Sequence, residues 1–187
     1  MTFSQRLRNL ALAAGLGAVA VLGIASSARS AELGDHAAIL NAVQRSGIRV
    51  FINPKVCVGH FADGWYSYND RSLVVCQDNM DPMRPGYIVE YTQNDLDTIR
   101  HEAHHVVQDC LKERDGDVDP LFDTQEEWYD FISKYLTEEQ MDYIVSNYQR
   151  MGADDKTIVT ELEAFAVARG VSPRHIAEAV DTICKDK

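Results

Sequence analysis

Residues 101–105 read His-Glu-Ala-His-His, a run whose residue types and spacing suit the binding of a metal ion. His101 and His105 are four residues apart, so in a helix they lie on the same face, about one turn apart. Neutral imidazoles with this spacing can bind one Zn²⁺ from the same side. Glu102 follows the first histidine, and its carboxylate can take a proton from a water molecule at the open metal position. The HExxH pattern therefore predicts a zinc centre with Glu102 as general base.

A helix must hold these side chains, and the surrounding sequence predicts one. Apolar residues recur at three- and four-residue steps, at Leu96, Ile99, Ala103, Val106, Val107 and Cys110. An amphipathic helix is the structural context that HExxH requires. Within it His104 points about 100° away from either ligand, which favours a supporting role over a ligand role. The alternative is a set of surface or core histidines that bind no metal.

A di-iron carboxylate bundle is a further alternative, because Glu102 and His105 also form an ExxH unit. Such bundles need a second ExxH unit on another helix. The sequence has none, so this alternative is set aside.

A catalytic zinc site uses three protein ligands and one open position. The segment 160–166, Thr-Glu-Leu-Glu-Ala-Phe-Ala, offers Glu161 and Glu163. Residues two positions apart on a helix differ by about 200° of rotation, so the two carboxylates cannot both face one metal ion. Ala164 and Ala168 lie beside Glu161, and such small residues let two helices approach closely. Glu161 is therefore the favoured ligand, with Glu163 as the alternative; in a third interpretation both are solvated helix acids.

These two motifs resemble the gluzincin branch of the zincin metallopeptidases, especially its small members and the CAAX-type proteases. Members of that branch pair HExxH with a downstream Glu-x-x-Ala on a second helix, whose Glu is the third zinc ligand. The resemblance covers roughly residues 94–169. It implies a zincin-like fold, a bound Zn²⁺ and hydrolysis of peptide bonds, and its Glu-x-Glu/Gln-Ala pattern fits Glu161 better than Glu163.

The sequence departs from the gluzincin pattern at one position. Many gluzincins have Asp or Asn four residues after the third ligand, where it supports a histidine ligand by a hydrogen bond. Here Phe165 follows Glu161 at that distance, and Val167 follows Glu163. Two acids four residues from a ligand histidine, Asp97 and Asp109, are candidates to replace it.

The N-terminus carries the features of an export signal. Arg6 and Arg8 precede an apolar run over residues 10–25, and the small residues Ser26, Ser27 and Ala28 follow. We therefore expect residues 1–28 to be a signal peptide, cleaved after Ala28, and residues 29–187 to form a single zincin-like domain. An uncleaved membrane anchor is the alternative, but about 16 apolar residues are few for a membrane span. The sequence thus predicts a secreted or periplasmic protein with no stable membrane span.

Cysteine number and net charge limit the alternatives further. Four cysteines in an exported chain suggest two disulfides, and we expect Cys57 to pair with Cys76 and Cys110 with Cys184. A structural zinc site made from them is disfavoured because they lack the close C-x-x-C spacing. The formal net charge of −11 argues against nucleic acid as a partner. Nothing in the sequence specifies an oligomeric state.

The predicted fold is α+β, with a small N-terminal sheet followed by a helical zincin-like domain. We expect a helix over 35–46 with Asp35 as N-cap, a strand over 48–52, a hairpin of 65–68 and 72–77, and another strand over 87–91. Capping signals predict helices after Thr124, Thr137 and Ser172, and a further helix over 154–169.

The sequence therefore predicts an exported zinc-dependent metallopeptidase that acts on a peptide or protein substrate. The alternative is a zincin-like secreted binding or envelope protein without proteolysis, which could still hold zinc. An intact HExxH with Glu102 favours the enzyme, whereas the missing Asp or Asn favours the binding protein. Tyr148 and Arg169 are the candidates for stabilising an oxyanion, and the sequence does not select between them.

Overall fold

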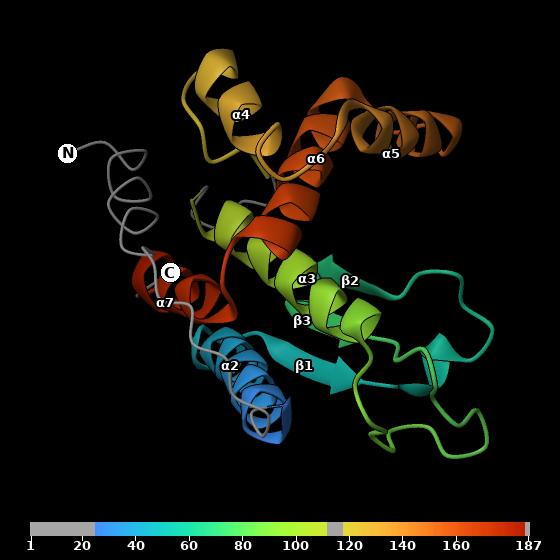
Figure 1. The fold of residues 1–187 in the computed structure, drawn as a ribbon. Helices are drawn as coiled ribbons and strands as arrows, with labels where there is room; N and C mark the ends of the chain where they lie inside the picture. Colours follow the sequence, from blue (N-terminus) through green and yellow to red (C-terminus); the bar gives the residue numbers. More distant parts are fainter. Residues whose placement is uncertain (1–24, 112–117, 186–187) are drawn as a thin grey trace.

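The computed structural model of the protein describes residues 25–111 and 118–185 (Figure 1). It is α+β, as the sequence predicts, with a small sheet after the N-terminal helix and helices over most of the remainder. The elements, in chain order, are α2 (Ala25–Arg45), β1 (Arg49–Ile52), the 3-10 helix η1 (Lys55–Cys57), β2 (Gly64–Ser67), β3 (Ser72–Val75), α3 (Gln93–Leu111), α4 (Gln125–Ile132), α5 (Glu138–Arg150), α6 (Asp155–Gly170) and α7 (Pro173–Ile183).

The N-terminal helix is longer than the sequence predicts. Within the described residues it extends back to Ala25, so Asp35 lies inside α2 and is not its N-cap. The predicted signal peptide falls mainly on residues 1–24, which lie outside the described residues, and the predicted cleavage point after Ala28 falls in the first turn of α2. Cleavage therefore remains a prediction.

The sheet has three strands in the order β1-β3-β2, with the most buried strand in the middle. All four residues of β3 are buried, which fits its apolar sequence, Ser-Leu-Val-Val. The predicted hairpin is confirmed, because β2 pairs antiparallel to β3, with Gly64 opposite Val75. On the other side β1 runs parallel to β3. The strand β2 is thus an edge strand.

The strand predicted over 87–91 does not form. That segment is held by two buried side chains instead of a backbone ladder. The Gln77 amide accepts from the Val89 N–H at 2.9 Å and donates to the Val89 carbonyl at 3.0 Å. Asn53 donates to the Tyr87 carbonyl at 2.8 Å. Paired side-chain amides therefore satisfy backbone groups that a fourth strand would have satisfied.

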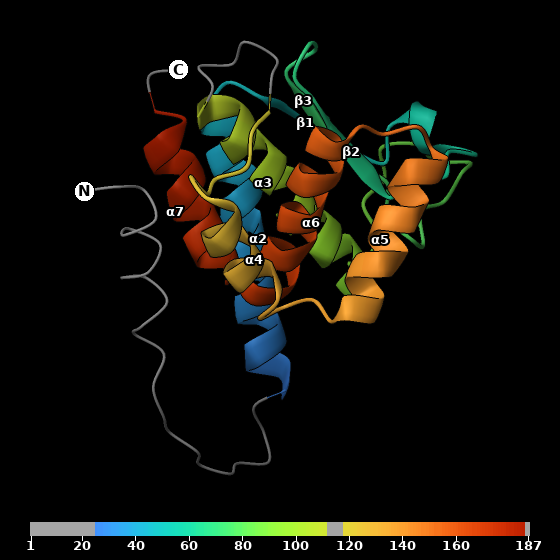
Figure 2. The same ribbon diagram turned by 90° about the horizontal axis from the view of Figure 1, so that it is seen from above.

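The helix α3 carries HExxH and lies at the centre of the molecule. In Figure 2 it lies between α2 on one side and α6 on the other. It also packs against β2, β3 and α7. Its apolar face joins the main core, where Ala103, Val106 and Cys110 have no exposed surface. This burial, worth about 25 cal/mol per Å² of apolar surface, fixes the orientation of the motif on the helix.

The helices α4, α5 and α6 form a second cluster above α3 in Figure 1. Thr137 opens α5 with a complete capping box, in which its hydroxyl and the Gln140 side chain each accept from the other residue's backbone N–H. The hydroxyls of Thr124 and Ser172 cap α4 and α7 as predicted. Gly170 ends α6 against the ring of Tyr135, whose atoms would lie 2.1–2.3 Å from an added Cβ. Only glycine fits at that contact.

Two disulfides close the fold, with the pairing that the sequence predicts. Cys57 is joined to Cys76 beside the sheet, and Cys110 is joined to Cys184. The second bond ties the C-terminal end of α7 to the last turn of α3. Disulfides form and persist in oxidising compartments, so the protein has the covalent structure of an extracytoplasmic protein. Among the described residues, no helix has the length and apolar character needed to cross a membrane.

Candidate metal centre

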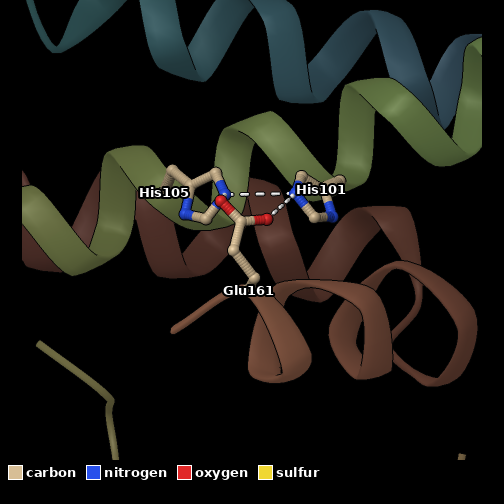
Figure 3. A group of neighbouring side chains, drawn as sticks. All are labelled: His101, His105 and Glu161. Carbon is tan, nitrogen blue, oxygen red and sulfur yellow. Dashed lines mark hydrogen bonds and ion pairs between the residues drawn. The ribbon is translucent and has the colours of Figure 1, made fainter. Parts of the chain in front are cut away.

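The two histidines of the motif present their Nε2 atoms to the same point in space. The Nε2 atoms of His101 and His105 are 3.1 Å apart, and both residues are buried or nearly so. The four-residue spacing on α3 produces this convergence, because successive turns place both rings on the face toward α6. Figure 3 shows both imidazoles pointing toward the carboxylate of Glu161.

Glu161 on α6 completes the group. Its Oε2 lies 3.0 Å from Nε2 of His101, and its Oε1 lies 3.4 Å from Nε2 of His105. One ligand atom from each of the three residues lies within 4.8 Å of the others. Atoms that share a tetrahedral zinc ion lie about 3.3 Å apart, given bond lengths of about 2 Å. The spacing and the His₂Glu composition therefore both fit a zinc ion.

The electrostatics of the group reflect this close approach. Burial lowers the pKa of His105, but the charge and hydrogen bond of Glu161 outweigh it and raise that pKa to about 9. Burial raises the pKa of Glu161, yet His105 and His101 together hold it well below its usual range. In the metal-free protein a positive charge on His105 and a negative charge on Glu161 thus stabilise each other.

Glu102 lies beside this group and outside it. It is 7% exposed, and burial raises the pKa of its carboxyl against the opposing effect of His101 and His105. The backbone N–H of Tyr66, on the edge strand β2, donates a hydrogen bond to it. A carboxyl whose pKa is moved toward neutrality is suited to accept and return a proton.

A cavity of about 300 Å³ lies next to the group, with His101 in its wall. Its wall includes His101 and Glu102 from α3, Tyr148 from α5 and Arg169 from α6. The remaining side comes from residues 61–64, which precede and begin β2. The helices α3, α5 and α6 and the start of β2 thus surround a hollow that both Glu102 and His101 line.

Tyr148 connects this cavity to Glu161. Its hydroxyl donates a hydrogen bond of 2.7 Å to Oε2 of Glu161. Burial and the charge of Glu161 raise the pKa of the phenol, so it keeps its proton. Both candidates for stabilising an oxyanion, Tyr148 and Arg169, line the cavity. Tyr148 also forms a hydrogen bond to Glu161, the third residue of the group.

Glu163 lies in a different place. It has no exposed surface and lies 2.7 Å from Nε2 of His104. The backbone N–H of Leu121 donates to both of its oxygens, at 3.0 and 3.1 Å. Burial lowers the pKa of His104, so His104 is a neutral donor to Glu163. The two glutamates of the segment 160–166 thus contact different histidines of α3: Glu161 contacts His101 and His105, and Glu163 contacts His104.

The partner of His105 differs from those that the sequence suggests. Asp109 accepts a 2.6 Å hydrogen bond from the hydroxyl of Tyr66, and Asp97 forms an ion pair with Arg100. Gln108 instead accepts a 2.7 Å hydrogen bond from Nδ1 of His105. Sequence reasoning missed Gln108, although its position three residues after His105 on a helix was an available signal.

Comparison with known proteins places the chain in a family and names no activity. Residues 22–184 match the model of a family described as a domain of unknown function, DUF8637, and the protein belongs to that family. Searches of curated proteins and of solved structures gave no match.

Proposed function

We propose that the protein is an exported zinc-dependent metallopeptidase whose metal ligands are His101, His105 and Glu161. The observation that carries this proposal is the convergence of one ligand atom from each residue, beside a cavity that His101 and Glu102 line. Two histidines and one carboxylate are a ligand set used in catalytic zinc sites, which keep a further position open. Zn²⁺ bound there would lower the pKa of a water molecule toward neutrality and polarise the carbonyl of a peptide bond.

Glu102 is the general base in this proposal. Its carboxyl is buried beside both histidines but belongs to none of the contacts that join the three ligand atoms. It can therefore accept a proton from the attacking water and return that proton to the leaving amine. The Tyr66 N–H supports the ionised form of the carboxylate, which is the form that must accept the proton.

Tyr148 and Arg169 bring donors to the same cavity. The phenol of Tyr148 keeps its proton and donates a hydrogen bond to Glu161 in the metal-free protein; it would have to turn from Glu161 to donate to a substrate oxygen. Arg169 adds a positive charge to the wall. Donors fixed near a carbonyl that gains negative charge stabilise the transition state of hydrolysis.

The proposed location is the periplasm or the extracellular space. Two disulfides favour an oxidising compartment, and the N-terminal sequence fits a cleaved signal peptide. A peptide or protein substrate suits such a location. The acidic net charge of −11 disfavours nucleic acid.

The test combines metal analysis with a cleavage assay on the protein purified after export. We expect about one zinc per chain, cleavage of members of a broad peptide library, and loss of cleavage in a chelator. His101→Ala, purified in parallel, should lose both zinc and cleavage. A folded wild type that takes up no zinc would overturn the proposal. Zinc uptake without any cleavage would replace it with a zincin-like binding protein.

A further inference from the structure

Gln108 connects the two histidine–glutamate pairs. Its side chain lies on α3 and has no exposed surface. Its Oε1 lies 2.7 Å from Nδ1 of His105, and its Nε2 lies 3.1 Å from Oε1 of Glu163. One amide thus touches the proposed zinc centre at one end and the buried carboxylate at the other.

The surroundings of the amide allow only one orientation of it. Its nitrogen faces two groups that can only accept, the carboxylate of Glu163 and the backbone carbonyl of Thr160, the latter at 3.3 Å. Exchanging nitrogen and oxygen would set an amide oxygen against both acceptors in a buried site, which costs about 1–3 kcal/mol for each group left unsatisfied. The oxygen of Gln108 therefore has to face His105.

This orientation decides which nitrogen of His105 can bind a metal ion. An amide oxygen can only accept, so Nδ1 of His105 must carry the proton that it donates. In the neutral ring the lone pair is then on Nε2, the atom that faces His101 and Glu161. His101 lacks such support, since its buried Nδ1 has no hydrogen-bond partner among the described residues.

We propose that Gln108 is a positioning residue that sets the tautomer and ring orientation of His105, and that Glu163 acts through it. The inference rests on the proposed zinc centre and adds how that centre is held. Glu163 is fixed independently by the backbone of Leu121 and by His104. The segment after α3 and the helix α6 thus both contribute to the orientation of a ligand on α3.

The test compares zinc affinity and the His105 side-chain proton in wild type and two variants. Gln108→Met keeps the length of the side chain and removes its hydrogen bonds to His105, Glu163 and Thr160. Gln93→Met makes the same change on an exposed position of α3 and serves as the control. Chelator competition gives the affinity, and NMR of labelled histidine side chains detects the Nδ1 proton.

We expect Gln108→Met to lower zinc affinity by about 10–100-fold, as is typical for the partner of a ligand histidine. The slowly exchanging Nδ1 proton of His105 should disappear in the same variant. A purely structural role of Gln108 would not predict the loss of that proton. Gln93→Met should match wild type.

Two results would overturn the inference, and they differ in what else they remove. If wild type binds zinc and Gln108→Met binds it equally well with the Nδ1 proton in place, Gln108 has no positioning role and the proposed function stands. If wild type binds no zinc, the proposed function fails and the inference fails with it.

Discussion

Glu161 and Glu163 are two residues apart on α6, yet they contact different histidines of α3. Glu161 lies 3.0 Å from Nε2 of His101 at the cavity, whereas Glu163 lies 2.7 Å from Nε2 of His104 in the core. Residues two positions apart on a helix differ by about 200° of rotation. This rotation separates an accessible carboxylate, suited to a metal ion, from one enclosed by donors. Glu161 is therefore the proposed metal ligand, whereas Glu163 belongs to a buried hydrogen-bond network.

The two glutamates should respond differently to the same substitution. Glu161→Gln should lower zinc affinity by more than about a hundredfold, since loss of a ligand exceeds the 10–100-fold effect of a ligand's partner. Glu163→Gln should remain within that range and should instead lower the free energy of unfolding by about 1–3 kcal/mol, because the buried network loses an acceptor. Competition with a chelator and urea unfolding measure the two effects. The reverse ranking for zinc would assign Glu163 as the ligand.

The sequence predicts those parts of the site that depend on local spacing. The convergence of His101 and His105 follows from four residues of helix, and the preference for Glu161 follows from the small residues beside it. Contacts between elements were beyond such reasoning. The bond from the Tyr66 N–H to Glu102 depends on how the edge strand β2 lies against α3, and the role of Gln108 depends on Glu163, 55 residues further along the chain.

The difference between local spacing and contacts between elements also explains why parts of the fold prediction are wrong. The segment 87–91 has strand-like residues, but the side chains of Asn53 and Gln77 already occupy its backbone groups. The sequence predicts that Asp35 begins a helix, but α2 already includes the ten residues before it, which are rich in alanine and serine. A residue type that favours the N-cap position therefore does not by itself mark the start of a helix.

The stability of the metal-free protein should depend on pH through His105. Its folded-state pKa of about 9 exceeds the ordinary value of 6.5: burial lowers it, but the charge of Glu161 raises it more, with help from Glu102 and Gln108. The contribution of the protonated ring is therefore complete below pH 6.5 and is lost as the pH rises through about 9.

In a chelator, the free energy of unfolding should fall by up to about 3 kcal/mol over that interval. Denaturant unfolding at a series of pH values measures this fall. His105→Asn provides the control, because it should lack the fall. A wild-type stability that is flat across this interval would contradict the ion pair between His105 and Glu161.

Gly64 should be required for the approach of β2 to α3. A Cβ at this position would lie 2.6 Å from Cγ2 of Thr98, 2.7 Å from the carbonyl oxygen of Val74 and 3.5 Å from Cγ of Glu102. Gly64→Ala should therefore push the strand outward and lower the free energy of unfolding by about 1–3 kcal/mol. Peptide cleavage should fall as well, since the strand carries the N–H that contacts Glu102.

Gly34→Ala is the matched control, because an added Cβ there meets nothing within 4 Å. It lies within α2, where alanine is favoured over glycine by about 1 kcal/mol, so it should leave cleavage unchanged and stability equal or higher. If Gly64→Ala and Gly34→Ala had the same thermal stability and the same rate of peptide cleavage, Gly64 would not be required for the approach of β2 to α3.

In the proposed reaction Glu102 moves protons beside a zinc ion that other residues hold. Glu102→Gln keeps the size of the side chain and removes its basicity, while His101, His105 and Glu161 are untouched. The most direct measurement is the rate of peptide cleavage by this variant and by wild type, each with its zinc content determined on the same sample. We expect equal zinc content and a rate of cleavage lower by at least about a hundredfold in Glu102→Gln, because general acid–base help is lost. Equal rates of cleavage at equal zinc content would contradict this role of Glu102.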